Sequence, residues 1–165
     1  MPESDVPESL PSDHAAESYE RGLALRKAGL FKQAIEQFEK AASDPALALK
    51  AYAQIGLSQK SCDRYEEAVT AFRNALKSPG ATTKETVQIL YVLGRTLESL
   101  GSIAEALEAY RWLRREDRLY RDVEERIDAL SKGRKRAELR STQTEAKAET
   151  SQHLHAWQSL LRNAK

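Results

Sequence analysis

The sequence has very little of what marks secreted or membrane-spanning proteins. Of its 165 residues one is cysteine, Cys62, so no internal disulfide can form, which suits a reducing compartment. No apolar run is long enough to span a bilayer, and the first residues lack the basic and apolar segments of a secretory signal. Lys and Arg number 26 and Asp and Glu 25, and a net charge of +1 argues against bulk electrostatic binding to nucleic acid or membrane. We therefore expect a cytoplasmic chain without membrane insertion.

Motifs for catalysis and for cofactor binding are missing too. There is no Gly-rich phosphate loop, no nucleophile elbow and no pair of zinc-type cysteines. His153 and His155 are two residues apart and point to different faces of a helix, so they do not form a metal pair. Adjacent carboxylates such as Glu66 and Glu67 do not face each other on a helix either. We expect no enzymatic activity, no metal and no cofactor.

Alanine, leucine, glutamate and lysine dominate residues 15–131 in a helical pattern. Residues 1–14 are acidic and rich in proline, which predicts a disordered tail. Residues 132–152 begin with a basic stretch around Gly133 and continue as a polar linker, and residues 153–165 form a short amphipathic C-terminal segment. The expected helices span residues 15–28, 31–42, 46–61, 64–77, 83–99, 103–115 and 119–131, with a marginal eighth at about 150–163.

Helix boundaries are marked by capping signals. Asp44 precedes Pro45, which places an N-cap before a proline at the first helical position. Gly29 and Gly101 stand where helices should end. Three pairs have the spacing of a capping box, in which a side chain and a glutamate satisfy free backbone N–H groups: Asp63 with Glu66, Thr82 with Glu85, and Ser102 with Glu105.

The helical region contains an internal repeat. Gly22 and Gly56 are 34 residues apart, and Gly56 and Gly94 are 38 apart. Four extra residues fit the turn at 78–81, where an insertion is easily absorbed. Each glycine is followed after twelve residues by an alanine and after sixteen by an aromatic residue: Ala34 and Phe38, Ala68 and Phe72, Ala106 and Tyr110. We expect the small residues to let helices approach closely and the rings to fill the space between repeats.

This pattern resembles the tetratricopeptide repeat (TPR) family, whose unit is a helix–turn–helix of 34 residues. Tyr52-x-x-Ile55-Gly56 and Leu90-x-x-Leu93-Gly94 carry the resemblance, which covers residues 15–117. It implies an all-α, right-handed helical solenoid of three repeats, with a capping helix at 118–131, a flexible N-terminal tail and a short C-terminal helix. It also implies a concave groove lined by the first helix of each repeat.

The resemblance maps a mostly basic set of side chains onto this groove, with tyrosines and leucines among the charges. Such a surface suits an acidic or amphipathic peptide segment of another protein. The expected contact residues are Tyr19, Leu23, Arg26, Lys27, Lys50, Leu57, Lys60, Tyr91 and Arg95, beside Ala53, Gln88 and Glu98.

One subclass of the family is excluded by its own motif. Chaperone adaptors of the family have a carboxylate clamp of Lys, Asn and Arg side chains. The matching positions here are Tyr19, Leu23, Gln54, Gln88 and Val92, and none carries the clamp residue. Recognition of chaperone C-termini in that mode is not expected.

The C-terminal segment is a second candidate for binding. Leu154, Trp157 and Leu161 are spaced as an apolar stripe on one side of a helix. Three alternatives stay open: docking on a partner or a neighbouring protomer, packing on the repeats of the same chain, and fraying. The first would make the protein an oligomerisation module or complex subunit.

The charged ends add two smaller hypotheses. The basic stretch 132–140 is a solvated linker or a contact for an anionic partner. The acidic residues of the N-terminal region, Glu3, Asp5, Glu8, Asp13 and Glu17, could compete for a basic groove within the same chain.

Taken together, these patterns predict a non-catalytic scaffold: a cytoplasmic adaptor or assembly factor that binds a peptide or helical segment of another protein in its groove. Self-association through the C-terminal segment is the alternative, and nucleic-acid binding is disfavoured by the charge balance.

Overall fold

The computed structural model describes the backbone of residues 12–162 and the side chains of residues 12–156. Within these residues the chain is all-α, as predicted, and contains no strand. Its helices are α1 (Asp13–Lys27), α2 (Phe31–Ala42), α3 (Pro45–Ser61), α4 (Tyr65–Lys77), α5 (Thr83–Ser99), α6 (Ile103–Glu116) and α7 (Val123–Arg162). Through α6 every boundary lies within two residues of its predicted place. Among the described residues no helix combines the length and apolar content that crossing a bilayer requires.

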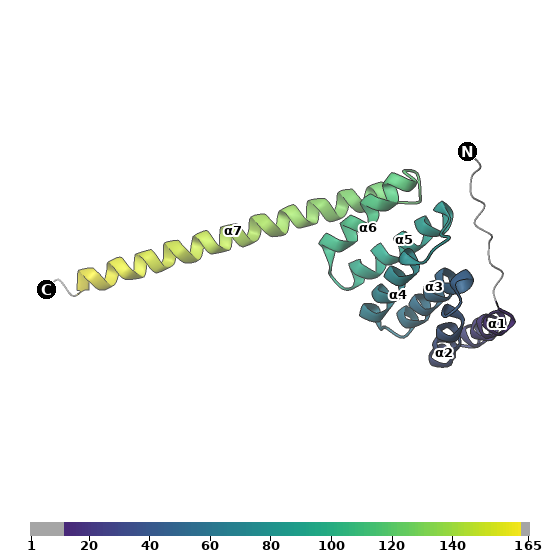
Figure 1. Ribbon diagram of the computed structural model, residues 1–165. Helices are drawn as coiled ribbons and strands as arrows, with labels where there is room; N and C mark the ends of the chain where they lie inside the picture. Colours follow the sequence, from purple (N-terminus) through teal and green to yellow (C-terminus); the bar gives the residue numbers. More distant parts are fainter. Residues whose placement is uncertain (1–11, 163–165) are drawn as a thin grey trace. The chain divides into compact units, whose positions relative to one another are not determined.

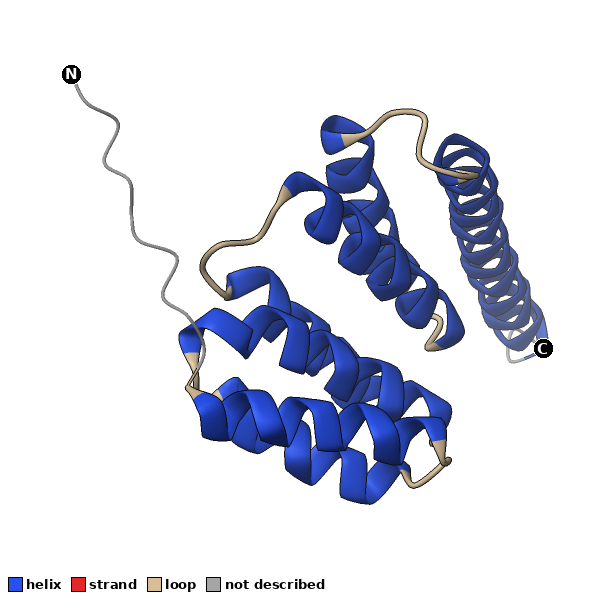
Figure 2. Ribbon diagram, turned by 90° about the vertical axis from the view of Figure 1, so that its right-hand side faces the viewer, coloured by secondary structure: helices blue, strands red, loops and turns tan. Residues whose placement is uncertain are grey.

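Helices α1 to α6 form three hairpins that stack in chain order (Figure 1). Figure 2 shows the short connections that join successive helices at alternate ends. Each hairpin turns on a residue with positive φ: Gly29 (77°), Asp63 (59°) and Gly101 (73°). The two glycines were predicted as helix ends. Asp63 occupies the equivalent place in the second repeat, because aspartate tolerates this left-handed conformation better than most residues.

Of the three predicted capping boxes only one forms. The Thr82 hydroxyl accepts the backbone N–H of Glu85, and the Glu85 carboxylate accepts the backbone N–H of Thr82. Asp63 lies in the turn before α4 and does not cap it, and Ser102 precedes α6 without a side-chain cap. The carboxylate expected to complete the third box, that of Glu105, instead pairs with Arg73 of α4 at 2.6 Å. These two capping predictions were wrong because an ion pair and a turn use the same side chains.

The predicted glycines and aromatic rings pack against each other inside each hairpin. A Cβ atom added to any of the three glycines would come within 2.6 Å of a ring atom, closer than real Cβ contacts allow. The rings are buried at 0–1% exposure, so the first helix of a hairpin approaches the second only because it lacks a side chain there. The pairs are Gly22 with Phe38, Gly56 with Phe72, and Gly94 with Tyr110. The rings therefore fill space within a repeat, and not only between repeats as predicted.

The N-terminal region is helical earlier than predicted. Ser12 is the N-cap of α1, and its backbone N–H donates to the Asp44 carboxylate at 2.7 Å. Asp13 lies in the first turn of α1, and Glu17 forms an ion pair with Arg21 at 3.0 Å. Residues 1–11, which hold most of the predicted acidic tail, lie outside the described residues.

The C-terminal part differs most from the prediction. In place of a capping helix at 119–131, a linker and a short helix, α7 runs without a break from Val123 to Arg162. Residues 132–152 contain no proline and one glycine, and they are rich in strong helix formers. Their threonine hydroxyls are satisfied inside the helix, as in the donation from Thr144 to the Arg140 carbonyl oxygen at 2.8 Å. The sequence analysis gave too much weight to Gly133, whose cost in a helix interior is only about 1 kcal/mol.

The chain divides into two compact units between Glu124 and Glu125, seven residues before the predicted end of the repeat domain at 131. Within the first unit, Glu124 at the start of α7 forms ion pairs with Arg114 and Arg118, both at 3.3 Å. The predicted domain limits remain predictions.

Candidate functional site

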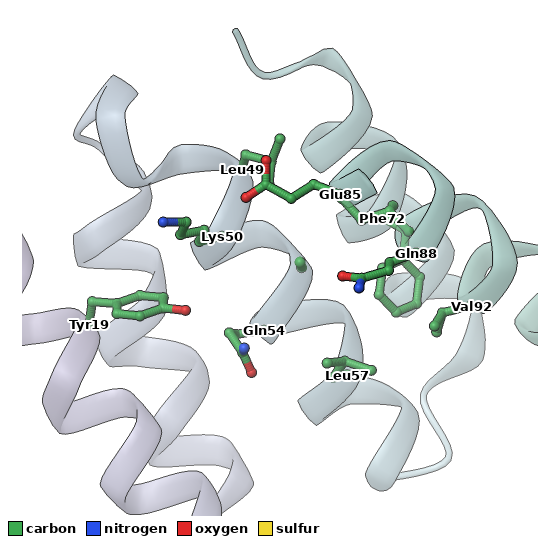
Figure 3. A pocket seen from close by; sticks show the side chains of 11 residues that line it. Tyr19, Leu49, Lys50, Gln54, Leu57, Phe72, Glu85, Gln88 and Val92 are labelled. Carbon is green, nitrogen blue, oxygen red and sulfur yellow. The ribbon is translucent and has the colours of Figure 1, made fainter. Parts of the chain in front are cut away.

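A groove runs across the first helices of the three hairpins, α1, α3 and α5. It encloses a cavity of about 220 Å³ (Figure 3). Its lining combines apolar side chains with a few polar groups, which is the usual character of a recognition site. The lining residues are Tyr19, Leu49, Lys50, Ala53, Gln54, Leu57, Phe72, Glu85, Gln88, Ile89 and Val92.

The polar centre of the groove is formed by Tyr19 and Gln54. Figure 3 shows the Tyr19 hydroxyl directed toward the side chain of Gln54. Burial raises the pKa of Tyr19 above its ordinary value, and the neighbouring Gln54 side chain lowers it in part. The Gln54 Oε1 atom is buried and has no hydrogen-bond partner among the described residues. A buried amide oxygen without a donor is unfavourable, so this acceptor is available for a donor from outside the chain.

The cations near the groove have no ion-pair partner within the described part of the chain. This holds for Lys50 in the lining and for Lys60 and Arg95 on α3 and α5. The pKa of Lys60 is lowered, first by partial burial and then by the positive charge of Arg95. Glu85 is the acidic residue in the lining, and its carboxylate is already bound to Thr82. The free charges at the groove are therefore positive.

The predicted contact residues divide into three groups. Tyr19, Lys50 and Leu57 line the groove, together with Ala53 and Gln88 from the same mapped set. Leu23 is half-buried and packs against the core cluster around Phe38. The cationic side chains Arg26, Lys27, Lys60 and Arg95 lie outside the lining, with Arg26 and Lys60 half-buried and the others exposed.

Tyr91 does not reach the groove, contrary to the prediction. Its side chain is buried, and its hydroxyl donates to the Asp122 carboxylate at 2.8 Å. Its ring packs edge-on against Tyr120 at 5.6 Å, with the Arg121 guanidinium 4.8 Å from its centre. Repeat spacing maps Tyr91 onto Tyr19, but only the third repeat is followed by the connection to α7, whose residues cover this position. Glu98, also mapped onto the groove, accepts a hydrogen bond from Tyr110.

Several groove residues were missed by the sequence reasoning. Leu49, Ile89 and Phe72 contribute apolar surface, and Glu85 was assigned to its cap alone. Gln54 and Val92 were considered only as positions of a carboxylate clamp, which they do not form, yet both line the groove. The clamp comparison was the available signal, because it had already placed these two residues on the groove side.

Of the predicted C-terminal stripe, the described side chain is that of Leu154, which is 58% exposed. Trp157 and Leu161 belong to α7, but their side chains lie outside the described residues. Leu154 therefore has an apolar side chain in solvent on a helical segment, which leaves docking on a partner open.

A second cavity of about 430 Å³ lies on another face of α5, between α4 and α6. Leu90 and Leu97 contribute to its apolar lining, and the half-exposed Trp112 lies among its lining residues. Arg73 and Glu105 pair across it. Helix α4 packs less extensively on α5 than α2 does on α3, in keeping with the longer connection at 78–82. No group of three or more His, Cys, Asp or Glu among the described residues could hold a metal ion.

Comparisons with known proteins agree with this geometry. Residues 63–119, which contain α4, α5 and α6, match the family model described as tetratricopeptide repeat. No curated protein matches the chain in sequence. Many solved structures share its fold, and three of them show the range.

The crystal structure of MamA is 20% identical, with a TM-score of 0.61 over 74% of this chain and 69% of that one. The second TPR domain of human RPAP3, in complex with an HSP70 peptide, is 18% identical, with a TM-score of 0.58 over 74% of this chain and 98% of that one. The Yersinia enterocolitica type III secretion chaperone SycD, in complex with a peptide of the translocator YopD, is 12% identical. Its TM-score is 0.61, over 74% of this chain and 96% of that one. At these identities the likeness shows the fold.

Proposed function

The chain belongs to the tetratricopeptide repeat family, and on that premise we propose that its groove binds a peptide segment of another protein. The protein would act as a non-catalytic adaptor or assembly factor. Two of the similar structures hold a bound peptide, which supports a peptide as the type of ligand. The single cysteine fits a reducing compartment, in line with action in the cytoplasm.

The observation that carries this proposal is the free acceptor in the middle of an apolar groove. Gln54 Oε1 is buried without a donor, and Leu57 and Val92 line the same cavity. A peptide supplies both things that this lining lacks: a backbone N–H for the amide oxygen and an apolar side chain for the cavity. A bound segment would therefore place one large apolar residue beside Leu57 and one backbone N–H at Gln54.

The charges near the groove indicate which segment binds. Lys50, Lys60 and Arg95 have no carboxylate partner among the described residues, so acidic side chains of a ligand can pair with them without displacing an existing ion pair. The partner we propose is an acidic or amphipathic segment. Tyr19, Gln54, Gln88 and Val92 are uncharged, so a terminal carboxylate would not be held at these positions.

A peptide library displayed on phage tests the proposal on the full chain. Selection on the wild type, with counter-selection on the Leu57→Glu variant, enriches sequences that need the groove. We expect a large apolar residue flanked by Asp or Glu. The matched control is Leu30→Glu, the same chemical change at a leucine that is 48% exposed in the α1–α2 turn, outside the groove lining.

Selected peptides should bind the control as well as the wild type and should lose affinity for Leu57→Glu and for Lys27/Lys60/Arg95→Glu. Peptides that bind all variants alike would show that the groove is not the working surface. Truncation after Gly133 should leave peptide affinity unchanged. Sedimentation of the full chain over a range of concentrations checks the predicted alternative, self-association through the C-terminal segment.

A further inference from the structure

Helix α7 carries its charges on separate sides. At about 100° per residue, Lys132, Arg136, Arg140 and Lys147 fall into one row along the helix. Glu138, Glu145 and Glu149 fall on the opposite side. Every residue from 132 to 156 is exposed, so both sides face solvent. The side with the cations we call the basic–apolar face, and it consists of Lys132, Lys135, Arg136, Leu139, Arg140, Lys147 and Leu154 and, by helical spacing, Trp157 and Leu161.

Existing ion pairs do not neutralise this face. Arg134 pairs with Glu138 at 2.8 Å, and both residues belong to the acidic side of the helix. None of the five cations of the basic–apolar face has an ion pair among the described residues. The net charge of +1 of the whole chain therefore hides a local cationic row.

The two sides act as separate surfaces. A helix with its side chains is about 10–12 Å across, while charges in physiological salt are screened over about 8 Å. The carboxylates of the acidic side are thus largely screened from a ligand on the opposite side. Charge balance, which argues against anion binding for the chain as a whole, does not argue against it for this face.

Apolar side chains lie in line with the cations. Leu139 is 63% exposed and Leu154 58%, and they are two of the five large hydrophobic residues that the described structure leaves exposed. Helical spacing extends this row to Trp157 and Leu161. A helix with a basic row and exposed leucine and tryptophan along the same side has the composition of helices that lie in a membrane interface.

We propose that the basic–apolar face of α7 binds the surface of an anionic lipid bilayer, with the helix lying on the membrane and not crossing it. The cations meet lipid phosphates and carboxylates, and Leu139, Leu154 and Trp157 enter the interfacial layer below them. Nucleic acid would satisfy the cations equally well but offers no apolar phase for the leucines, and tryptophan is enriched at membrane interfaces. The apolar residues therefore favour the bilayer.

Co-sedimentation of the full chain with lipid vesicles tests this surface. One set of vesicles is phosphatidylcholine, and the other also contains phosphatidylserine. We expect binding to the second set only, weakening as salt is added. In a Trp112→Phe background Trp157 is the remaining tryptophan, and its fluorescence should shift to shorter wavelength when the anionic vesicles are added.

Two variants with equal net charge separate the face from the overall charge. Lys132/Arg136/Arg140→Glu and Lys27/Lys60/Arg95→Glu each change the net charge from +1 to −5, since three reversals remove six units. The first should lose affinity for the anionic vesicles by about a hundred-fold or more, at roughly five-fold for each cation removed. The second, which alters the repeats, should bind vesicles as the wild type does. Leu139/Leu154→Ser should lose about ten-fold, and circular dichroism verifies that α7 stays helical.

Three results would overturn the proposal. The first is absence of binding to phosphatidylserine vesicles at low salt. The second is an equal loss in both charge variants, which would reduce the effect to net charge. The third is tighter binding to an RNA or DNA duplex than to vesicles, with Leu139/Leu154→Ser binding the duplex normally. Failure of peptide selection on the groove would leave all these measurements unaffected, because they depend on α7.

Discussion

Gly56 lies directly against the ring of Phe72, and a Cβ atom on Gly56 would stand 2.6 Å from the ring atom Cε1. Phe72 is 1% exposed, so its ring has no solvent into which it can move. The same relationship recurs in the repeats before and after. The spacing of 16 residues between glycine and ring therefore expresses one packing contact, and each hairpin depends on it.

This contact predicts that Gly56→Ala destabilises the protein. Alanine is the better helix former by about 1 kcal/mol, but overpacking a filled core costs about 1–3 kcal/mol. We expect a net loss in the free energy of unfolding, measured by urea denaturation. Gly133→Ala is the matched control: a Cβ there meets nothing within 4 Å, so only the gain in helix propensity remains, and helicity should rise. Equal effects at both positions would contradict the packing argument.

The helix caps give a second prediction. Thr82→Ala removes the capping box of α5 and should cost about 1 kcal/mol of stability, within the range of about 0.5–2 kcal/mol known for N-caps. Ser102→Ala occupies the same position before α6, where no side-chain cap bond forms, so its effect should be close to zero. Thermal unfolding of the two variants decides the matter. A loss at Ser102 as large as that at Thr82 would mean that Ser102 does cap α6.

Helices α1 to α6 could be predicted from the sequence because local signals determine them. The Gly–aromatic spacing, the Asp44-Pro45 start and the turn glycines act over one or two helical turns. What the sequence could not give depends on distant residues. The carboxylate of Glu105 pairs with Arg73, 32 residues away, in place of capping its own helix.

The errors at the groove and at α7 have the same origin. Repeat spacing places Tyr91 beside Tyr19, but the connection to α7, specific to the last repeat, buries it. In the stretch that was predicted as a linker, Gly133 and the polar residues were interpreted as a break. Their helix propensities, summed over some twenty residues, favour a helix, and only Gly133 opposes it.

The buried place of Tyr91 gives a third prediction. Tyr91→Phe keeps the ring and removes the hydrogen bond to Asp122, which should cost about 1 kcal/mol of stability, because the Asp122 carboxylate loses a donor. Binding of groove-selected peptides should be unchanged. Calorimetric unfolding and a peptide titration measure the two quantities on one sample. A loss of peptide affinity without a loss of stability would return Tyr91 to the groove.

The lowered pKa of Lys60 gives a fourth prediction. Partial burial and the charge of Arg95 both disfavour the protonated amine in the fold, so the folded pKa lies below the ordinary value of 10.5. Protonation then opposes folding, and stability should increase as pH rises from the folded pKa toward the unfolded one. Arg95→Gln should raise the pKa of Lys60, seen in an NMR titration of the lysine Cε carbon. A bound acidic peptide should raise it as well. An unchanged midpoint in Arg95→Gln would exclude Arg95 as a cause.

The free acceptor of Gln54 predicts a conflict between stability and binding. Gln54→Leu removes a buried oxygen that has no donor among the described residues, and leaving such a group unpaired costs about 1–3 kcal/mol. The unliganded variant should therefore be at least as stable as the wild type by urea denaturation. Peptide affinity should fall, because the backbone N–H of the ligand loses its acceptor and is buried unpaired. Gln88→Leu, in the same lining but exposed, should change both quantities less. A variant at Gln54 that loses stability and keeps its affinity would show that the amide serves the fold, and the groove would then need another group to hold the peptide backbone.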